Sequence, residues 1–166
     1  MTLVFPPLRL GAMLLLSLAV AACGFQLRGE QTLPEVMAVT YVDGPDRESL
    51  LFETLVEALK RTDIQITDDA SEATAVLMLV QDIAGQRVLS VTTQGNPEEY
   101  ELYRTLQYEL VAGEETLVRS LPITVTRDYA WVETDVIGTQ RQAQRLDAGL
   151  ADELTALIIR TLSAAR

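Results

Sequence analysis

The sequence contains no histidine and only one cysteine, Cys23. Without histidine, the chain lacks the commonest general base, the commonest transition-metal ligand and any Ser-His-Asp arrangement. A single cysteine cannot form an intramolecular disulfide, and a free thiol would be a liability in an oxidising compartment. What remains for catalysis is carboxylates, hydroxyls and the single lysine, Lys60. We therefore expect no enzyme, no cofactor and no metal site.

The first 22 residues differ from the rest of the chain. Arg9 is their only charge, and residues 10–22 (LGAMLLLSLAVAA) are nearly all apolar. This run is too short for a membrane-spanning helix, which needs about 20 apolar residues. A charged start, an apolar stretch and small residues before a cleavage site are typical of a secretory signal peptide.

The end of this leader, Val20-Ala21-Ala22-Cys23, resembles the lipobox of bacterial lipoproteins. In such signals the cysteine thiol receives a diacylglyceryl group, cleavage follows, and the new amino terminus is acylated, here expected as N-palmitoyl. We therefore expect residues 1–22 to be removed and lipidated Cys23 to anchor the mature chain to a membrane. Gly24 follows, where an aspartate would resemble the signal for retention in the inner membrane, so the outer membrane is favoured. An ordinary signal peptide beside a free cysteine is the alternative.

The mature chain is acidic. It carries 24 acidic and 12 basic residues, because Arg9 is lost with the leader, which leaves a net charge near −12. Nucleic-acid binding needs a basic surface, so we do not expect nucleic acid as a partner. Asp68, Asp69 and Glu72 do not have the spacing of a calcium loop and indicate a solvated turn.

The hydrophobic pattern predicts one α+β domain over residues 36–166, preceded by a lipidated linker at 23–35. Residues 36–42 are rich in β-branched side chains, typical of a strand. Apolar residues recur at helical spacing over 47–61 and again over about 140–164, whereas 75–127 read as an antiparallel meander with a kink near Gly85 and Pro122 at an edge or bulge. The predicted order is β-α-β-β-β-α, with two helices on one face of a four-stranded, mostly antiparallel sheet.

The arginines are the most suggestive polar residues for a binding site. We expect them on the long hairpins and at the start of the last helix: Arg87, Arg104, Arg119, Arg127, Arg141 and Arg145. Arginines gathered on one edge could hold an anion through charge-assisted hydrogen bonds. Each arginine alone is more often part of a surface ion pair, so both interpretations stay open.

The segment from Cys23 to Gly29 (CGFQLRG) resembles the mature start of the LptE family of lipopolysaccharide-assembly lipoproteins. Three further features are similar to that family: Leu33-Pro34 before the first strand, Gly95 followed by Glu99-Tyr100 at a hairpin turn, and Gln140-Arg141-Gln142 at the start of the last helix. The resemblance covers the whole mature chain, and its N-terminal motif is the most specific part.

The resemblance implies an outer-membrane lipoprotein, on the periplasmic side, that plugs the β-barrel protein LptD and assists barrel assembly. The pair delivers lipopolysaccharide to the cell surface, and the lipoprotein can bind lipopolysaccharide. Arg87, Arg141 and Arg145 are the candidates for that contact. The hairpin tip, Thr92-Thr93-Gln94-Gly95, lacks the basic residue that some relatives carry. Two other functions stay open: a lipid-anchored accessory subunit of another envelope transport system, and an envelope hydrolase that uses carboxylates.

Overall fold

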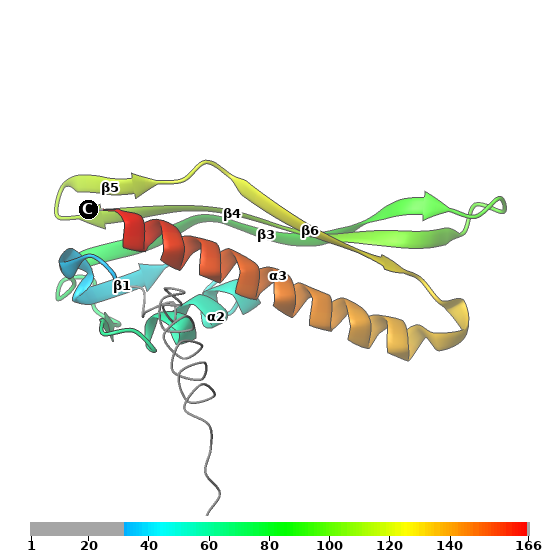
Figure 1. Ribbon diagram of the computed structural model, residues 1–166, viewed down its shortest axis with the longest axis horizontal. Coiled ribbons are helices and arrows are strands. Elements are labelled where there is room, and N and C mark those ends of the chain that lie inside the picture. The colour runs from blue at the N-terminus through cyan, green and yellow to red at the C-terminus, as the bar shows by residue number, and fades with distance from the viewer. Residues whose placement is uncertain (1–31, 166) are drawn as a thin grey trace, which may run out of the picture. The chain divides into compact units, whose positions relative to one another are not determined.

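The computed structural model describes residues 32–165 (Figure 1). The expected signal peptide, Cys23 and most of the expected linker, residues 23–31, lie outside the described residues. Within the described part the elements are η1 (Glu35–Met37), β1 (Val39–Asp43), α2 (Leu50–Leu59), β2 (Gln65–Thr67), β3 (Ala75–Val91), β4 (Pro97–Ala112), β5 (Glu115–Arg119), β6 (Ile123–Ala130), η2 (Glu133–Asp135) and α3 (Val136–Ala164).

The strands form one six-stranded mixed sheet. The order is β2-β1-β3-β4-β5, and β6 also pairs with β4. β1 runs parallel to both of its neighbours, with Thr40 opposite Ile66 of β2 and opposite Ala75 of β3. β3 and β4 form a long antiparallel hairpin whose turn contains Gly95 at φ 86°, a conformation that favours glycine.

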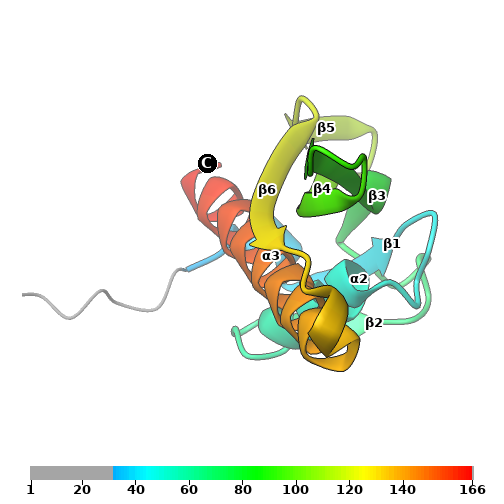
Figure 2. The same cartoon turned by 90° about the vertical axis from the view of Figure 1, so that its right-hand side faces the viewer.

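Both helices pack on the same face of the sheet, and Figure 2 shows them together on one side of the strands. The main core joins α2 and α3 to the first half of β3 and the second half of β4. Its fully buried members include Leu55, Leu77, Leu110, Leu154 and Ile158. We call this region, where both helices cover the sheet, the helix-covered half.

The predicted fold class is confirmed: two helices lie on one face of a mixed sheet in an α+β arrangement. The sheet has six strands instead of the four expected. The short segment 65–67 pairs with β1, and the last part of the meander expected over 75–127 divides into β5 and β6. Both pieces pair with β4, and the division falls just before Pro122, which has no N–H to donate. Between the two strands Ser120 still contacts β4, because its hydroxyl accepts a hydrogen bond from the Tyr108 N–H at 2.8 Å.

Two features of the long elements also differ from expectation. β3 continues through Gly85, where a kink was expected, and its register shifts fall instead at Leu79/Gln81 and at Val88–Val91. α3 begins at Val136, before the expected residue 140, because the Asp135 carboxylate accepts from the Gly138 N–H at 3.0 Å and caps the helix.

Candidate functional site: the hairpin extension and the start of helix α3

The second half of β3 and the first half of β4, residues 80–104, extend past the helix-covered half, and we call them the hairpin extension. Along β3, Ala75, Leu77 and Leu79 are buried, whereas from Val80 to Val91 every residue is at least partly exposed and only the side chain of Asp82 is buried. In β4 the alternation continues further, since Leu102 and Arg104 are still buried. The reason is that α3 lies along β4 and β6 here and leaves much of β3 open. This exposed region carries Arg87, the binding candidate that the sequence placed on the hairpins.

Arg87 lies on the face of the sheet that points away from the helices. Arg87 pairs with Glu101, and the preceding pair, Gln86 and Leu102, faces α3. Because successive side chains of a strand point to opposite faces, Arg87 and Glu101 point away from α3. Its guanidinium forms an ion pair with the Glu101 carboxylate at 2.5 Å and lies 5.9 Å from the centre of the Tyr103 ring. The side chain remains 66% exposed. Arg87 can therefore reach a ligand, but its charge is already shared with a carboxylate.

Arg141 and Arg145 lie one turn apart on α3, and both are exposed. No carboxylate among residues 32–165 lies within ion-pair distance of either. Because α3 packs on the other face of the sheet from Arg87, the structure brings Arg141 and Arg145 together but separates them from Arg87.

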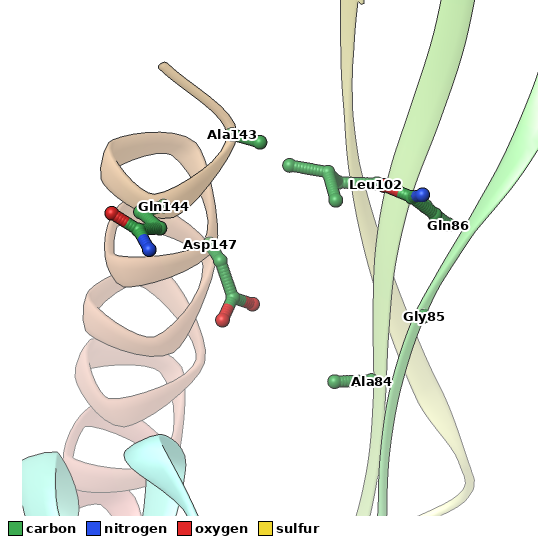
Figure 3. Close-up of a pocket in the computed structure, with 7 residues that line it drawn as sticks. All are labelled: Ala84, Gly85, Gln86, Leu102, Ala143, Gln144 and Asp147. Carbon is green, nitrogen blue, oxygen red and sulfur yellow. The ribbon is translucent and has the colours of Figure 1, made fainter. Parts of the chain in front are cut away.

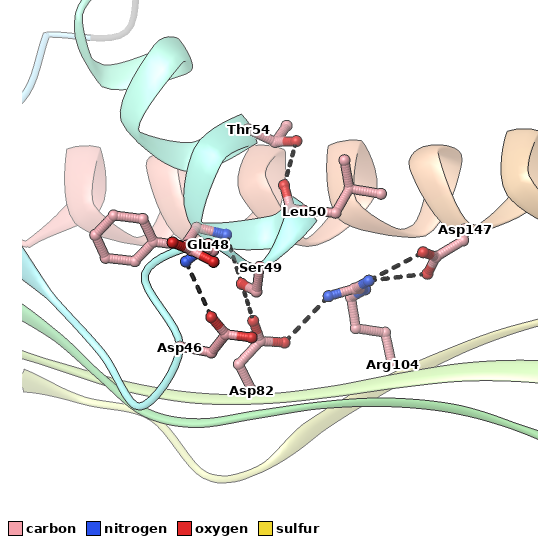
Figure 4. Close-up of polar contacts among 9 residues, drawn as sticks. Asp46, Glu48, Ser49, Leu50, Thr54, Asp82, Arg104 and Asp147 are labelled. Carbon is pink, nitrogen blue, oxygen red and sulfur yellow. Dashed lines mark hydrogen bonds and ion pairs between the residues drawn. The ribbon is translucent and has the colours of Figure 1, made fainter.

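Arg104 is buried between two carboxylates (Figure 4). Its Nη1 donates to Asp82 of β3 at 3.2 Å, and its Nη2 donates to both oxygens of Asp147 of α3, at 3.0 and 3.1 Å. The Ser49 hydroxyl, which caps α2, donates to the other Asp82 oxygen at 2.5 Å. This network connects α2, β3, β4 and α3. Its cation is neutralised on both sides, so it holds the elements together and offers no anion site.

The remaining arginines of the hairpins are surface ion pairs. Arg119 pairs with Glu109 at 2.9 Å, and Arg127 pairs with Glu153 at 2.6 Å. Four of the six arginines that could have formed a single anion site are thus paired separately, at different places on the sheet. Only Arg141 and Arg145 keep the arrangement that an anion would need.

A second, smaller core joins Leu102 of β4, Tyr129 of β6 and Leu150 of α3, and an aromatic cluster covers its end. The Tyr100 ring stacks on Tyr129 with centroids 5.8 Å apart and meets Trp131 edge-on at 5.7 Å. Burial raises the pKa of the Tyr129 hydroxyl, and the neighbouring Tyr100 adds to this shift. The hydroxyl therefore stays protonated at neutral pH and donates to the Gln86 side chain at 3.0 Å. Through these contacts Trp131 and Tyr129 cover an edge of the core.

A mostly apolar hollow of about 320 Å³ lies between the hairpin extension and α3. Figure 3 shows its walls, with Ala84 and Leu102 on the strand side and Ala143 and Asp147 on the helix side. The hollow exists because α2 begins beside Asp82, to which its N-cap residue Ser49 donates a hydrogen bond. The helix covers no part of the sheet beyond that point.

The acidic turn at residues 68–72 behaves as expected. The hydroxyl and the N–H of Ser71 both donate to the Asp69 carboxylate, at 2.7 and 2.8 Å, and these bonds lower the pKa of Asp69. Within residues 32–165 no cluster of three or more acidic, histidine or cysteine side chains could hold a metal ion.

Sequence reasoning missed the buried network and the hollow. The members of the network are far apart in the chain: Arg104 is 22 residues from Asp82 and 43 from Asp147. The available signal was Asp82 itself, a carboxylate two residues after the apolar run 75–80 of the same strand, because a charge next to a core is almost always paired.

Comparison with known proteins settles the family. The family model described as LptE, lipopolysaccharide-assembly, matches residues 36–162. The chain belongs to the LptE family. It is 33% identical over 129 residues to the LPS-assembly lipoprotein LptE of Pectobacterium atrosepticum, a match that covers 70% of this chain and 65% of that protein. The LptE of Yersinia enterocolitica is 24% identical over 155 residues, covering 90% and 74% respectively.

The solved structure of lipoprotein B from Nitrosomonas europaea has the same fold as this LptE-family chain. The TM-score is 0.70 at 22% identity, covering 85% of this chain and 91% of that one. Family membership confirms the expectation of a non-enzymatic protein, since the LptE relatives are named as assembly lipoproteins. Among the described residues no helix combines the length and the apolar character needed to cross a membrane.

Proposed function

We propose that this chain is an outer-membrane lipoprotein that plugs the β-barrel protein LptD and assists its assembly in the lipopolysaccharide translocon. The family match over residues 36–162 carries the proposal. The lipobox-like sequence ending at Cys23 supports an anchor on the membrane that holds the barrel. The uncovered face of the sheet and the hairpin extension supply surface that a surrounding partner could contact.

A pull-down through a C-terminal tag tests the partner. After gentle detergent extraction, an outer-membrane β-barrel of the LptD kind should co-purify in about equal amount and be identified by mass spectrometry. Co-purification with an inner-membrane complex and no barrel would contradict the proposal and favour an accessory subunit of another envelope transport system.

Radioactive palmitate tests the anchor. The wild-type chain should take up label, and a Cys23→Ala variant should take up none, because the variant lacks the thiol that starts lipidation. Label retained by Cys23→Ala would refute anchoring at this residue.

We place direct lipopolysaccharide contact first on Arg141 and Arg145. These side chains are exposed and have no carboxylate partner within residues 32–165, so their charge is available to a lipid phosphate. Arg87 is a weaker candidate, since it would have to share its charge with Glu101. The net charge of −11 opposes an anionic lipid elsewhere on the surface.

An Arg141→Ala/Arg145→Ala variant should bind lipopolysaccharide about tenfold more weakly, the equivalent of roughly 1.4 kcal/mol. Arg160→Ala, an exposed arginine near the other end of the same helix, is the matched control and should bind as the wild type does. Equal binding by the double variant and the control would refute the assignment.

A further inference from the structure

β3 becomes an edge strand where it leaves the helix-covered half. β1 pairs only with Ala75–Met78, whereas β4 pairs with β3 on its other side as far as Val91. From Leu79 to Val91, one side of β3 therefore has no strand partner among residues 32–165. Backbone N–H and C=O groups along such an edge can pair with another extended chain.

This edge lacks the features that usually prevent pairing. Natural edge strands carry lysines, prolines or unpaired charges, or are covered by another element. Residues 80–91 contain neither lysine nor proline, and their two charges, Asp82 and Arg87, are already paired within the chain. The exposed apolar side chains of this segment are Val80, Ile83, Val88, Leu89 and Val91, each 45–55% exposed. Between its register shifts, residues 81–88 form a regular edge.

The opposite edge provides an internal comparison. β6 follows Pro122, carries the charge of Asp128, and packs against α3 through the second core. Those are the protective features that β3 lacks. The difference indicates that the exposed β3 edge serves a purpose that β6 does not.

The hollow of about 320 Å³ gives the edge a place for side chains. Successive side chains of a strand point to opposite faces, so a strand added beside β3 would direct every second side chain toward α3. Those side chains would enter the space bounded by Ala84, Ala143 and Asp147. Backbone pairing would provide affinity, and the hollow would select small or aliphatic side chains, with a carboxylate at its rim.

Charge distinguishes among the possible occupants. A second copy of this chain would bring two proteins of charge −11 together, close to Glu98, Glu99 and Glu101 of the adjoining β4. The chain's own N-terminal region enters the fold at η1, beside the first residues of β3, since the Thr74 hydroxyl donates to the Val36 carbonyl. A neutral or basic extended segment of another protein fits the edge better than either of these.

We propose that the β3 edge of the hairpin extension binds an extended segment of the barrel partner, which joins the sheet as an additional strand next to β3. The occupant is a neutral or basic stretch with small aliphatic side chains at alternate positions. This inference rests on the proposed function, because the barrel supplies the strand.

Amide hydrogen exchange on the complex, purified through the tagged full-length chain, tests the pairing directly. The amides of residues 80–88 that point away from β4, every second one along the strand, should exchange about tenfold or more slowly in the complex than in the isolated chain, because the new strand protects them. Contact through side chains alone would leave these amides exchanging as before. If no barrel co-purifies, the proposed function and this inference both fail. If the barrel co-purifies and residues 80–88 stay unprotected, only the inference fails.

Two substitutions test the same surface by a different route. Ile83→Lys places a charge on the edge, and Ala84→Phe fills the hollow with the chain's own side chain. Each should lower the amount of co-purified barrel about tenfold, provided that circular dichroism shows a folded chain. The matched controls are Leu121→Lys, at a side chain 83% exposed between β5 and β6, and Ala130→Phe on β6, and neither should lower it.

Barrel recovery equal to wild type in both folded edge variants would overturn the inference. Protection of residues 80–88 in the isolated chain, together with a dimer mass, would also overturn it in favour of a second copy. If either edge variant fails to fold, hydrogen exchange on the wild-type complex alone decides.

Discussion

The buried guanidinium of Arg104 shows how a single residue holds distant parts of this fold in place. Two carboxylates and a serine hydroxyl complete the network, and the Asp82 side chain is only 2% exposed. A buried ion pair adds little net stability against an apolar replacement of the whole group, but removal of one member leaves a buried charge without compensation. The position therefore tolerates change poorly.

Replacement of Arg104 by methionine should destabilise the protein by about 3–5 kcal/mol, because Asp82 and Asp147 would then face each other without a cation. Urea unfolding followed by circular dichroism gives the free energy of unfolding. Arg119→Met, which removes an exposed ion pair, should cost no more than about 1 kcal/mol. Similar losses in the two variants would contradict the structural role of the network.

Gly85 lies against the end of the Tyr103 side chain. A Cβ at this position would lie 2.6 Å from the Tyr103 hydroxyl oxygen and 2.7 Å from the ring carbon that bears it. Gly85→Ala should therefore cost about 1 kcal/mol or more. In a Tyr103→Ser background the same substitution should become neutral or stabilising, since the clash is gone and the unfolded chain loses freedom. Thermal unfolding of the four proteins of this cycle measures the sign change, and simple additivity would count against the clash.

Single residues also show where sequence reasoning about the site succeeded and where it failed. The position of Arg141 and Arg145 near the start of the last helix was correctly expected, because helical spacing alone places them one turn apart. Their separation from Arg87 was not predictable. It depends on which face of the sheet the Arg87 side chain occupies. The register shift between Leu79 and Gln81 reverses the faces to which the later side chains of β3 point.

At the scale of elements, the two helix N-caps differ in their surroundings. Ser49 accepts from the Phe52 N–H at 3.1 Å and also donates to buried Asp82. Asp135 accepts from the Gly138 N–H at 3.0 Å and is exposed. The same kind of substitution should therefore have unequal costs.

Asp135→Ala should lower the free energy of unfolding by about 1 kcal/mol, the usual value of a cap. Ser49→Ala should cost about 2–3 kcal/mol, because it also leaves a buried Asp82 oxygen without its donor. Denaturant unfolding of both variants under the same conditions provides the comparison. Equal costs would mean that the contact between Ser49 and Asp82 contributes nothing to stability.

Helices and long strands were largely predictable because their hydrophobic periods are clear over many residues. The strand count was not. β2 spans only Gln65–Thr67, too short to show a period, and it becomes a strand through pairing with β1. β5 and β6 are separate strands that both pair with β4. This pairing is a property of the assembled sheet, so no local sequence pattern shows it.

At the scale of the described fold, stability and exposed surface belong to different parts. The large buried side chains concentrate in the helix-covered half, whereas no residue from 89 to 99 is buried. The outer end of the hairpin extension should therefore contribute little to folding.

Replacement of residues 89–99 by Asn-Gly would join Val88 to its partner Tyr100 through a two-residue turn. The free energy of unfolding should change by no more than about 0.5 kcal/mol, as for other changes at exposed positions. Thermal and urea unfolding of the shortened chain check this. A loss of more than about 2 kcal/mol would show that the hairpin end supports the core.

The parallel position of β1 has a consequence for the order of folding. Thr40 pairs with Ala75, which lies 35 residues later, whereas β3 and β4 are joined by a tight turn. Local pairings close quickly and distant ones slowly, so we expect the hairpin to form first and β1 to insert between β2 and β3 last. In a chain delivered N-terminus first, β1 and the apolar face of α2 must wait for residues 75–78 to arrive. During that interval they are the segments most prone to aggregate and most in need of a chaperone.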